Sequence, residues 1–211
     1  MSKNLVPKNY IQVILTFTYH WSIANANVIG SPIIVEGNYT LANLQSNHVL
    51  LSAIFQKIIA FQNEIKNYST SIHIQTKTLK LRMTQFNQAV RGLYPASIYT
   101  KNLATIPSIR DSGDKWKRAM DKTGAIWARI NTEAAPFTLS GYTLAQFQAE
   151  AGALRATTAA WQERQRAARL AIEEREQLWK AIVPRLVAYR RMVAGRFEAG
   201  SWVISSLPKL Y

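Results

Sequence analysis

The sequence predicts an all-α protein, an elongated helical bundle made of two tandem units, and two observations support that class. A motif near the start, GNYTLANLQ at 37–45, returns as GYTLAQFQ at 141–148. Each copy is followed by a long stretch that is nearly free of glycine and proline. Because those two residues break helices, such stretches are typical of long helices.

The repeat extends well beyond the motif. Tyr39 corresponds to Tyr142, and the same offset relates further pairs: Leu51 and Leu154, Ala53 and Ala156, Gln62 and Gln165, Arg82 and Arg185, Val90 and Val193, Gly92 and Gly195. A duplicated unit usually cannot bury its apolar face alone and packs against its copy. We therefore expect a first helical unit over 1–107 and a second over 108–211, with one shared core.

Both long stretches carry mostly apolar residues at alternating spacings of three and four. One stripe runs from Leu41 to Val90 and the other from Leu144 to Val193. A stripe kept for about seven heptads indicates long helices packed as in coiled coils and bundles. Gln62 and Gln165 hold the same polar position in the two stripes, where a polar residue commonly fixes register. The pattern leaves open whether the long helices run parallel or antiparallel.

The first element in the chain is expected to be a short helix over Lys8–Asn25. Taken alone, 10–21 is rich in β-branched and aromatic residues and favours a strand. However, Trp21 and Asn25 recur at the same spacing as Trp127 and Asn131 in the second copy. The symmetry of the two copies therefore favours a helix.

An extended loop and the first long helix come next. Thr40 stands just before this helix, where its hydroxyl can cap free amides, and Gly92 is a natural residue to close it. Inside the helix, 67–76 is polar and β-branched, which makes it a poor helix former. The second copy is strongly helical at the same place, and we therefore expect an unbroken helix.

The second unit repeats this order. Asp111–Asn131 is expected to form an amphipathic helix, with Asp111 or Ser112 as its cap. Thr143 precedes the second long helix, and Gly195 is expected to close it. Pro184 should kink that helix without ending it.

The second unit also carries a family resemblance. Its start, GYTLAQFQ at 141–148, and its end, SLPKL at 206–210, resemble uncharacterised bacterial helical proteins that share a GYTLxxFQ…SLPxL pattern. The resemblance implies a helical, duplicated architecture, and it implies no activity or site.

The charge balance is strongly basic. Lys and Arg number 26 against 12 Asp and Glu, which gives a formal net charge of +14 at pH 7. This excess favours attraction to polyanions but does not bear on the fold. No apolar run approaches the roughly 20 residues of a membrane span. Polar residues such as Gln12 and Thr16 in the first apolar stretch argue against a cleaved signal peptide, and the compartment stays open, with the cytoplasm as the default.

Catalysis, metal binding and cofactors are not expected. The chain has no cysteine, which excludes disulfides and thiol chemistry. Of its three histidines, His20, His48 and His73, the last two lie several turns apart along one expected helix and cannot share a metal ion. No phosphate-binding loop, hydrolase motif or metalloprotease motif is present. We therefore predict that the protein is not an enzyme and has no small-molecule substrate.

Two functions remain. The favoured one is a structural or assembly protein that forms homo-oligomers or scaffolds partners, with aromatic side chains outside the stripes as interface anchors. These aromatic candidates are Trp116, Trp202, Tyr99 and Tyr211.

The alternative is a basic helical module that binds nucleic acid or another polyanion. The same charges would also suit an acidic protein partner. The candidate contact residues are Lys57, Lys66, Lys77, Lys80, Arg82, Arg91, Lys115, Lys117, Arg118, Lys122, Arg190, Arg191 and Arg196.

Overall fold

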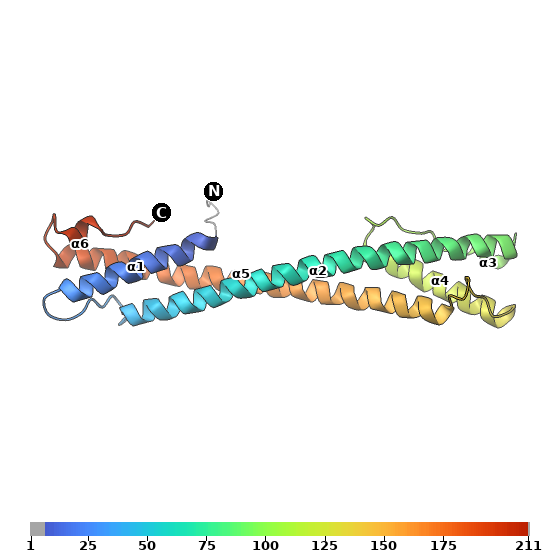
Figure 1. The fold of residues 1–211 in the computed structure, drawn as a ribbon, viewed down its shortest axis with the longest axis horizontal. Helices are drawn as coiled ribbons and strands as arrows, with labels where there is room; N and C mark the ends of the chain where they lie inside the picture. The colour runs from blue at the N-terminus through green and yellow to red at the C-terminus, as the bar shows by residue number, and fades with distance from the viewer. Residues whose placement is uncertain (1–6, 211) are drawn as a thin grey trace. The chain divides into compact units, whose positions relative to one another are not determined.

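The protein was analysed as a computed structural model, which describes residues 7–210 and the side chains from Tyr10 onward. This part of the chain contains helices and no strand, so the predicted all-α class is confirmed. The helices, labelled in Figure 1, are α1 (Pro7–Asn27), α2 (Leu41–Leu93), α3 (Ile98–Lys101), α4 (Gly113–Glu133), α5 (Leu144–Arg196) and α6 (Trp202–Ser205).

The helices form two compact units, and each unit takes half of each long helix. Unit 1 contains the residues up to Gln62 and those from Arg166 onward, and unit 2 is Asn63–Gln165. The two sequence copies, 1–107 and 108–211, are therefore divided differently from the compact units. Each compact unit combines the start of one copy with the end of the other.

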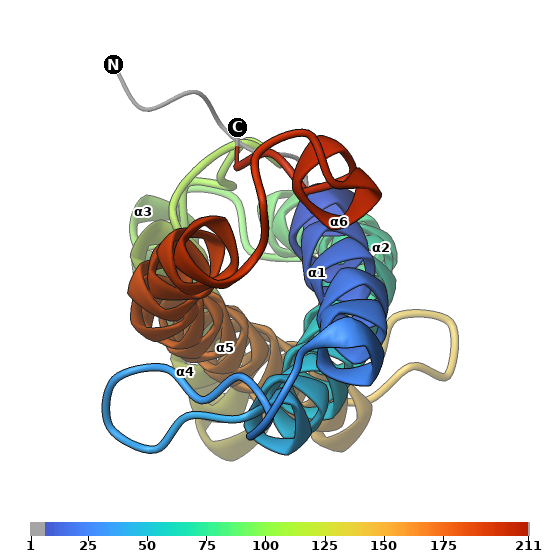
Figure 2. The same cartoon turned by 90° about the vertical axis from the view of Figure 1, so that its left-hand side faces the viewer.

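Unit 1 packs α1 against the first half of α2 and the second half of α5, and α6 lies against α1 (Figure 2). Its long helices are antiparallel, because the guanidinium of Arg185 near the end of α5 lies 6.0 Å from the centre of the Tyr39 ring just before α2, whereas Lys57, further along α2, meets Glu174. The buried core residues are Tyr10, Ile14, Phe17, Trp21, Ala24, Ile33, Val35, Leu44, Leu51, Phe55, Ile182, Leu186, Tyr189, Val193 and Val203.

Unit 2 has the same plan, with α4 packed against the second half of α2 and the first half of α5. Here too the long helices are antiparallel. Glu64 in α2 pairs with Arg164 in α5 at 2.6 Å, whereas Arg82, further along α2, lies over the Tyr142 ring just before α5. The fully buried side chains include Met83, Phe86, Val90, Trp127, Ile130 and Phe147.

Most expected elements are confirmed. α1 is a helix although its residues favour a strand, and α2 is unbroken through 67–76. Pro184 lies inside α5, which continues to Arg196. The expected helix ends were wrong by a residue or two, because neither Gly92 nor Gly195 adopts a positive φ and both lie inside their helices. The tails after the long helices contain the single turns α3 and α6.

The start of each long helix is capped in the same way. The Thr40 hydroxyl accepts the Asn43 amide (3.4 Å), while the Asn43 side chain accepts the Thr40 amide (2.8 Å). Thr143 and Gln146 make the corresponding pair of bonds at 3.3 and 2.8 Å. Both threonines thus form reciprocal capping boxes, as expected of their position.

The loop between each short helix and long helix is anchored through a single residue. In unit 1, the Trp21 indole donates to the Ile33 carbonyl (3.2 Å), and the Asn25 side chain accepts the Ile33 amide (2.9 Å). In unit 2, Trp127 donates to the Phe137 carbonyl (2.9 Å) and Asn131 accepts its amide (2.8 Å). Since Trp and Asn are four residues apart, they share one helix face and bind both backbone polar groups of the same residue.

The two cores differ in their polar contacts, and one such contact in unit 1 is made by His20. In unit 1, the buried His20 ring contacts the Val203 carbonyl through Nε2 (2.8 Å) and the Tyr189 hydroxyl through Nδ1 (2.6 Å). Because a carbonyl only accepts, Nε2 carries the proton and Tyr189 donates to Nδ1. Burial raises the pKa of Tyr189. Phe86 occupies the position of Tyr189 in unit 2, where it stacks on Trp127.

Removing one loop anchor should destabilise the protein. Asn131→Ala takes away the acceptor of the part-buried Phe137 amide and should lower the free energy of unfolding by about 1–3 kcal/mol. Urea denaturation followed by circular dichroism measures this change. The control is Asn27→Ala, whose exposed side chain donates to the Ile23 carbonyl, and it should cost less than about 0.5 kcal/mol. Equal losses in the two variants would contradict an anchoring role for Asn131.

Candidate interaction surfaces

The predicted polyanion-contact residues do not form one continuous face. Several are engaged within their own unit: Lys57 pairs with Glu174 at 3.9 Å, Arg196 donates to the Ser31 carbonyl, and the guanidinium of Arg82 lies 4.3 Å from the centre of the Tyr142 ring. Lys80 and Arg190 are half-buried, whereas Lys66, Lys77, Arg91, Lys117 and Arg191 are exposed.

The densest basic group lies on α4. Lys115, Arg118 and Lys122 follow one another at spacings of three and four, so they share one face of that helix. They line a pocket of about 380 Å³ between α4 and the segment that precedes it. Sequence reasoning selected these cations, but it did not predict the pocket beside them.

Asp111 is the carboxylate that lines this pocket. It accepts the Ser108 amide at 2.7 Å and the Lys115 ammonium at 2.8 Å. Of the two residues expected to cap α4, Ser112 takes the cap position without a side-chain cap bond. The Asp111 carboxylate instead accepts the amide of Ser108, which precedes the helix. The Lys115 bond and the Ser108 bond hold the pKa of the Asp111 carboxyl below its ordinary value.

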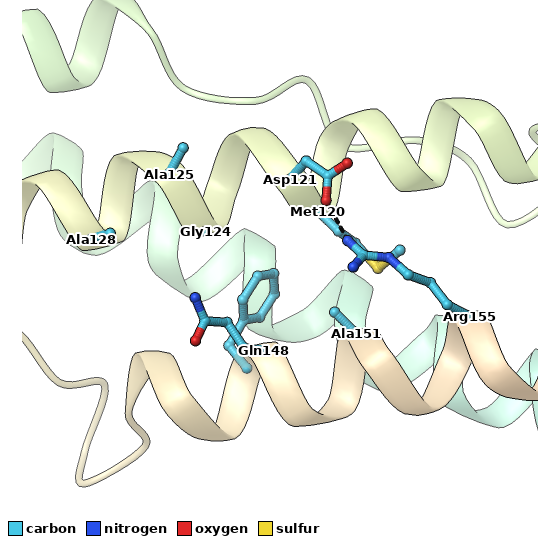
Figure 3. Close-up of a pocket in the computed structure, with 9 residues that line it drawn as sticks. Met120, Asp121, Gly124, Ala125, Ala128, Gln148, Ala151 and Arg155 are labelled. Carbon is cyan, nitrogen blue, oxygen red and sulfur yellow. Dashed lines mark hydrogen bonds and ion pairs between the residues drawn. The ribbon is translucent and has the colours of Figure 1, made fainter.

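A second hollow in unit 2 lies between α4 and the start of α5 (Figure 3). It measures about 260 Å³ and is bordered by the small residues Gly124, Ala125 and Ala128 on α4. Arg155 reaches from α5 to an ion pair with Asp121 at one end. Nothing among its lining residues is a buried, unpartnered polar group, and the hollow therefore gives no indication of a ligand.

Unit 1 carries an apolar groove of about 340 Å³ between α2 and α5. Leu50, Ala53 and Ile54 line it from α2, and Leu178 lines it from α5. Lys57 and Glu174 stand at its rim and are each about half exposed, at 55% and 56%. These apolar residues were not selected from the sequence. Aliphatic side chains outside the heptad stripe, such as Leu50, were the signal that could have found them.

The aromatic candidates have different environments. Trp116 is only 4% exposed, and its indole donates to the Ser108 carbonyl at 3.1 Å, so its assignment as an interface anchor was wrong: it belongs to the core of unit 2. Tyr99 is half-buried and donates to Glu133. Trp202 is 53% exposed on α6. Tyr211 lies outside the described residues.

The two stripe glutamines are not equally buried. Gln62 is exposed and Gln165 is half-buried. A polar residue fixes register by being buried against a partner helix, so the exposed Gln62 gives that hypothesis no support. The register role of the pair stays a prediction.

Metal binding and membrane crossing also bear on function. Across 7–210, no three His, Asp or Glu side chains gather in a way that could hold a metal ion. In the same range, no helix combines the length and apolar character needed to cross a membrane. His20 lies in the core, His48 is half-buried and His73 is exposed.

Comparison with models of protein families, with curated proteins and with solved structures gave no match.

The depressed pKa of Asp111 provides a test of the rim contacts on α4. Lys115→Gln should raise the pKa of the Asp111 carboxyl toward its ordinary value of 3.8, because the main hydrogen bond to the charged form is lost. Carboxyl titration by NMR measures this shift. Lys117→Gln is the control and should leave the pKa unchanged. An unchanged value in Lys115→Gln would contradict the ion pair.

Proposed function

We propose that the protein is a non-enzymatic structural or assembly protein that associates with a second copy of itself through the apolar groove of unit 1. The observation that carries this proposal is the exposure of large aliphatic side chains at and near the groove. Leu50, which lines the groove, is 54% exposed, and its chain neighbour Val49 is 65% exposed. Contiguous exposed apolar surface is typical of interaction sites.

The charges at the rim of the groove favour a second copy as its occupant. Lys57 lies on the α2 side and Glu174 on the α5 side, so the rim carries one charge of each sign. A two-fold contact between identical surfaces makes each contact twice, so a pair between Lys57 of one copy and Glu174 of the other would be formed on both sides of the axis. An exposed ion pair at 3.9 Å contributes little within one chain, and its partners are free to exchange.

A structural role also agrees with the distribution of reactive groups. Carboxylates are few, and cysteine is absent. The groove contains Glu174 as its one acidic residue, and that group faces a lysine and no histidine. General acid–base chemistry needs a second titratable group within hydrogen-bonding reach of a bound reactant.

Light scattering after size exclusion at about 1 M sodium chloride tests this function. An apolar contact survives salt that screens exposed charges, so a mass above the 23.8 kDa monomer is expected. Leu50→Glu should restore the monomer mass, because it introduces a charge into the groove beside Glu174. A wild-type protein that elutes as a clean monomer would contradict the proposal.

Ala153→Glu provides a matched control. Ala153 is the counterpart of Leu50 in the second copy and is also exposed, and it is not among the residues that line the groove. This variant should keep the oligomeric mass. If both variants dissociated equally, added negative charge and not the groove would be responsible.

A further inference from the structure

The basic pocket on α4 supports an inference that goes beyond self-association and does not depend on it. Its inner surface includes Ala104 and Ala119, both buried, together with Pro107. Thr105 and Ile106 complete the wall opposite α4. The basic side chains, which are all exposed, therefore stand at the rim of a hollow with a largely apolar lining.

Two of the three cations at the rim are not neutralised by a carboxylate. Lys115 is paired with Asp111, whose oxygens also accept the Ser108 amide. The Nε of Arg118 donates only to the Asp114 carbonyl, at 3.4 Å, and Lys122 has no hydrogen bond or ion pair within the described residues. Most of the donors of Arg118 and all those of Lys122 thus remain available to an anion.

The duplication shows that these cations are not needed for folding. Trp21 and Trp127 fix the alignment of α1 with α4, and on this alignment the buried positions of α4 fall on buried residues of α1 except Ala119, whose counterpart Val13 is half-buried. The positions of Lys115, Arg118 and Lys122 are occupied in α1 by the uncharged residues Asn9, Gln12 and Thr16. The same helix plan therefore carries the basic group in one copy and lacks it in the other.

We propose that this pocket of unit 2 binds a phosphate group. The planar fork of Arg118 and the ammonium of Lys122 match the charge and the several acceptor oxygens of phosphate. No aromatic side chain lines the pocket, so bases have no surface to stack on. Recognition is thus limited to the phosphate itself, carried either by a small molecule or by a nucleic-acid backbone.

The test uses the full chain and the double variant Arg118→Gln/Lys122→Thr, which introduces the residues found at the equivalent positions of α1. Isothermal titration with inorganic pyrophosphate at low salt is expected to show binding by the wild type. The double variant should bind at least about tenfold more weakly, because charge-assisted hydrogen bonds are lost. Circular dichroism should show unchanged folding, since the replacements suit the same helix plan.

Lys77→Gln/Arg91→Gln is the matched control. It removes the same charge from exposed positions of α2 in the same unit, and binding should change by less than about twofold. Equal weakening in both double variants would overturn the proposal in favour of diffuse charge attraction. Absence of pyrophosphate binding by the wild type at low salt would also overturn it.

A second titration with a short DNA duplex separates the two sources of phosphate. If the duplex binds and pyrophosphate displaces it, the pocket accepts backbone phosphates; if only pyrophosphate binds, its ligand is a small phosphorylated molecule. Leu50→Glu, which lies in unit 1, should bind pyrophosphate as the wild type does. Pyrophosphate binding by a wild-type protein that does not self-associate would therefore contradict the assembly function alone.

Discussion

Both cores depend on the hydrogen bonds that a tryptophan and an asparagine make to one residue of the following loop. In each unit the indole N–H and the asparagine oxygen satisfy the carbonyl and the amide of that residue, Ile33 or Phe137. A chain that reverses direction beside a core would otherwise leave these groups unpaired, at a cost of about 1–3 kcal/mol each. The anchored loop then places the capping threonine at the start of the long helix.

The long helices are antiparallel because each unit combines one half of α2 with the opposite half of α5. Within unit 1 the first half of α2 meets the second half of α5, and within unit 2 the second half of α2 meets the first half of α5. Each short helix supplies one layer, and the remaining apolar surface of its core comes from both copies. A single copy could not complete either core, which is the physical reason for the duplication.

The helices could be predicted from sequence because their signals are local or repeated. The repeat of Trp21 and Asn25 as Trp127 and Asn131 correctly favoured helix over strand in α1. The pairing of the long helices could not be predicted, because the stripes have apolar partners in either direction. Trp116 was misplaced although it shares a spacing of three and four with the buried residues Met120, Trp127 and Ile130 of α4, a pattern that indicates a buried face.

The surfaces could be predicted only in part. Lys115, Arg118 and Lys122 were selected as cations, but a pocket depends on the segment packed against them, which leaves no periodic signal. The groove at Leu50 could not be predicted, because exposed aliphatic residues are common on ordinary protein surfaces. The two units thus share an anchored core and differ in what they display, an apolar groove on one and a basic pocket on the other.

The central structural claim is that the long helices run antiparallel within each unit, and the absence of native cysteine makes it directly testable. Lys57→Cys/Glu174→Cys, at positions whose charged groups lie 3.9 Å apart, should be joined within one chain by a short bis-maleimide cross-linker added to dilute protein. Lys57→Cys/Arg191→Cys should not, because Arg191 lies toward the end of α5 that adjoins the start of α2. Efficient cross-linking of 57 to 191 with none to 174 would contradict the antiparallel arrangement.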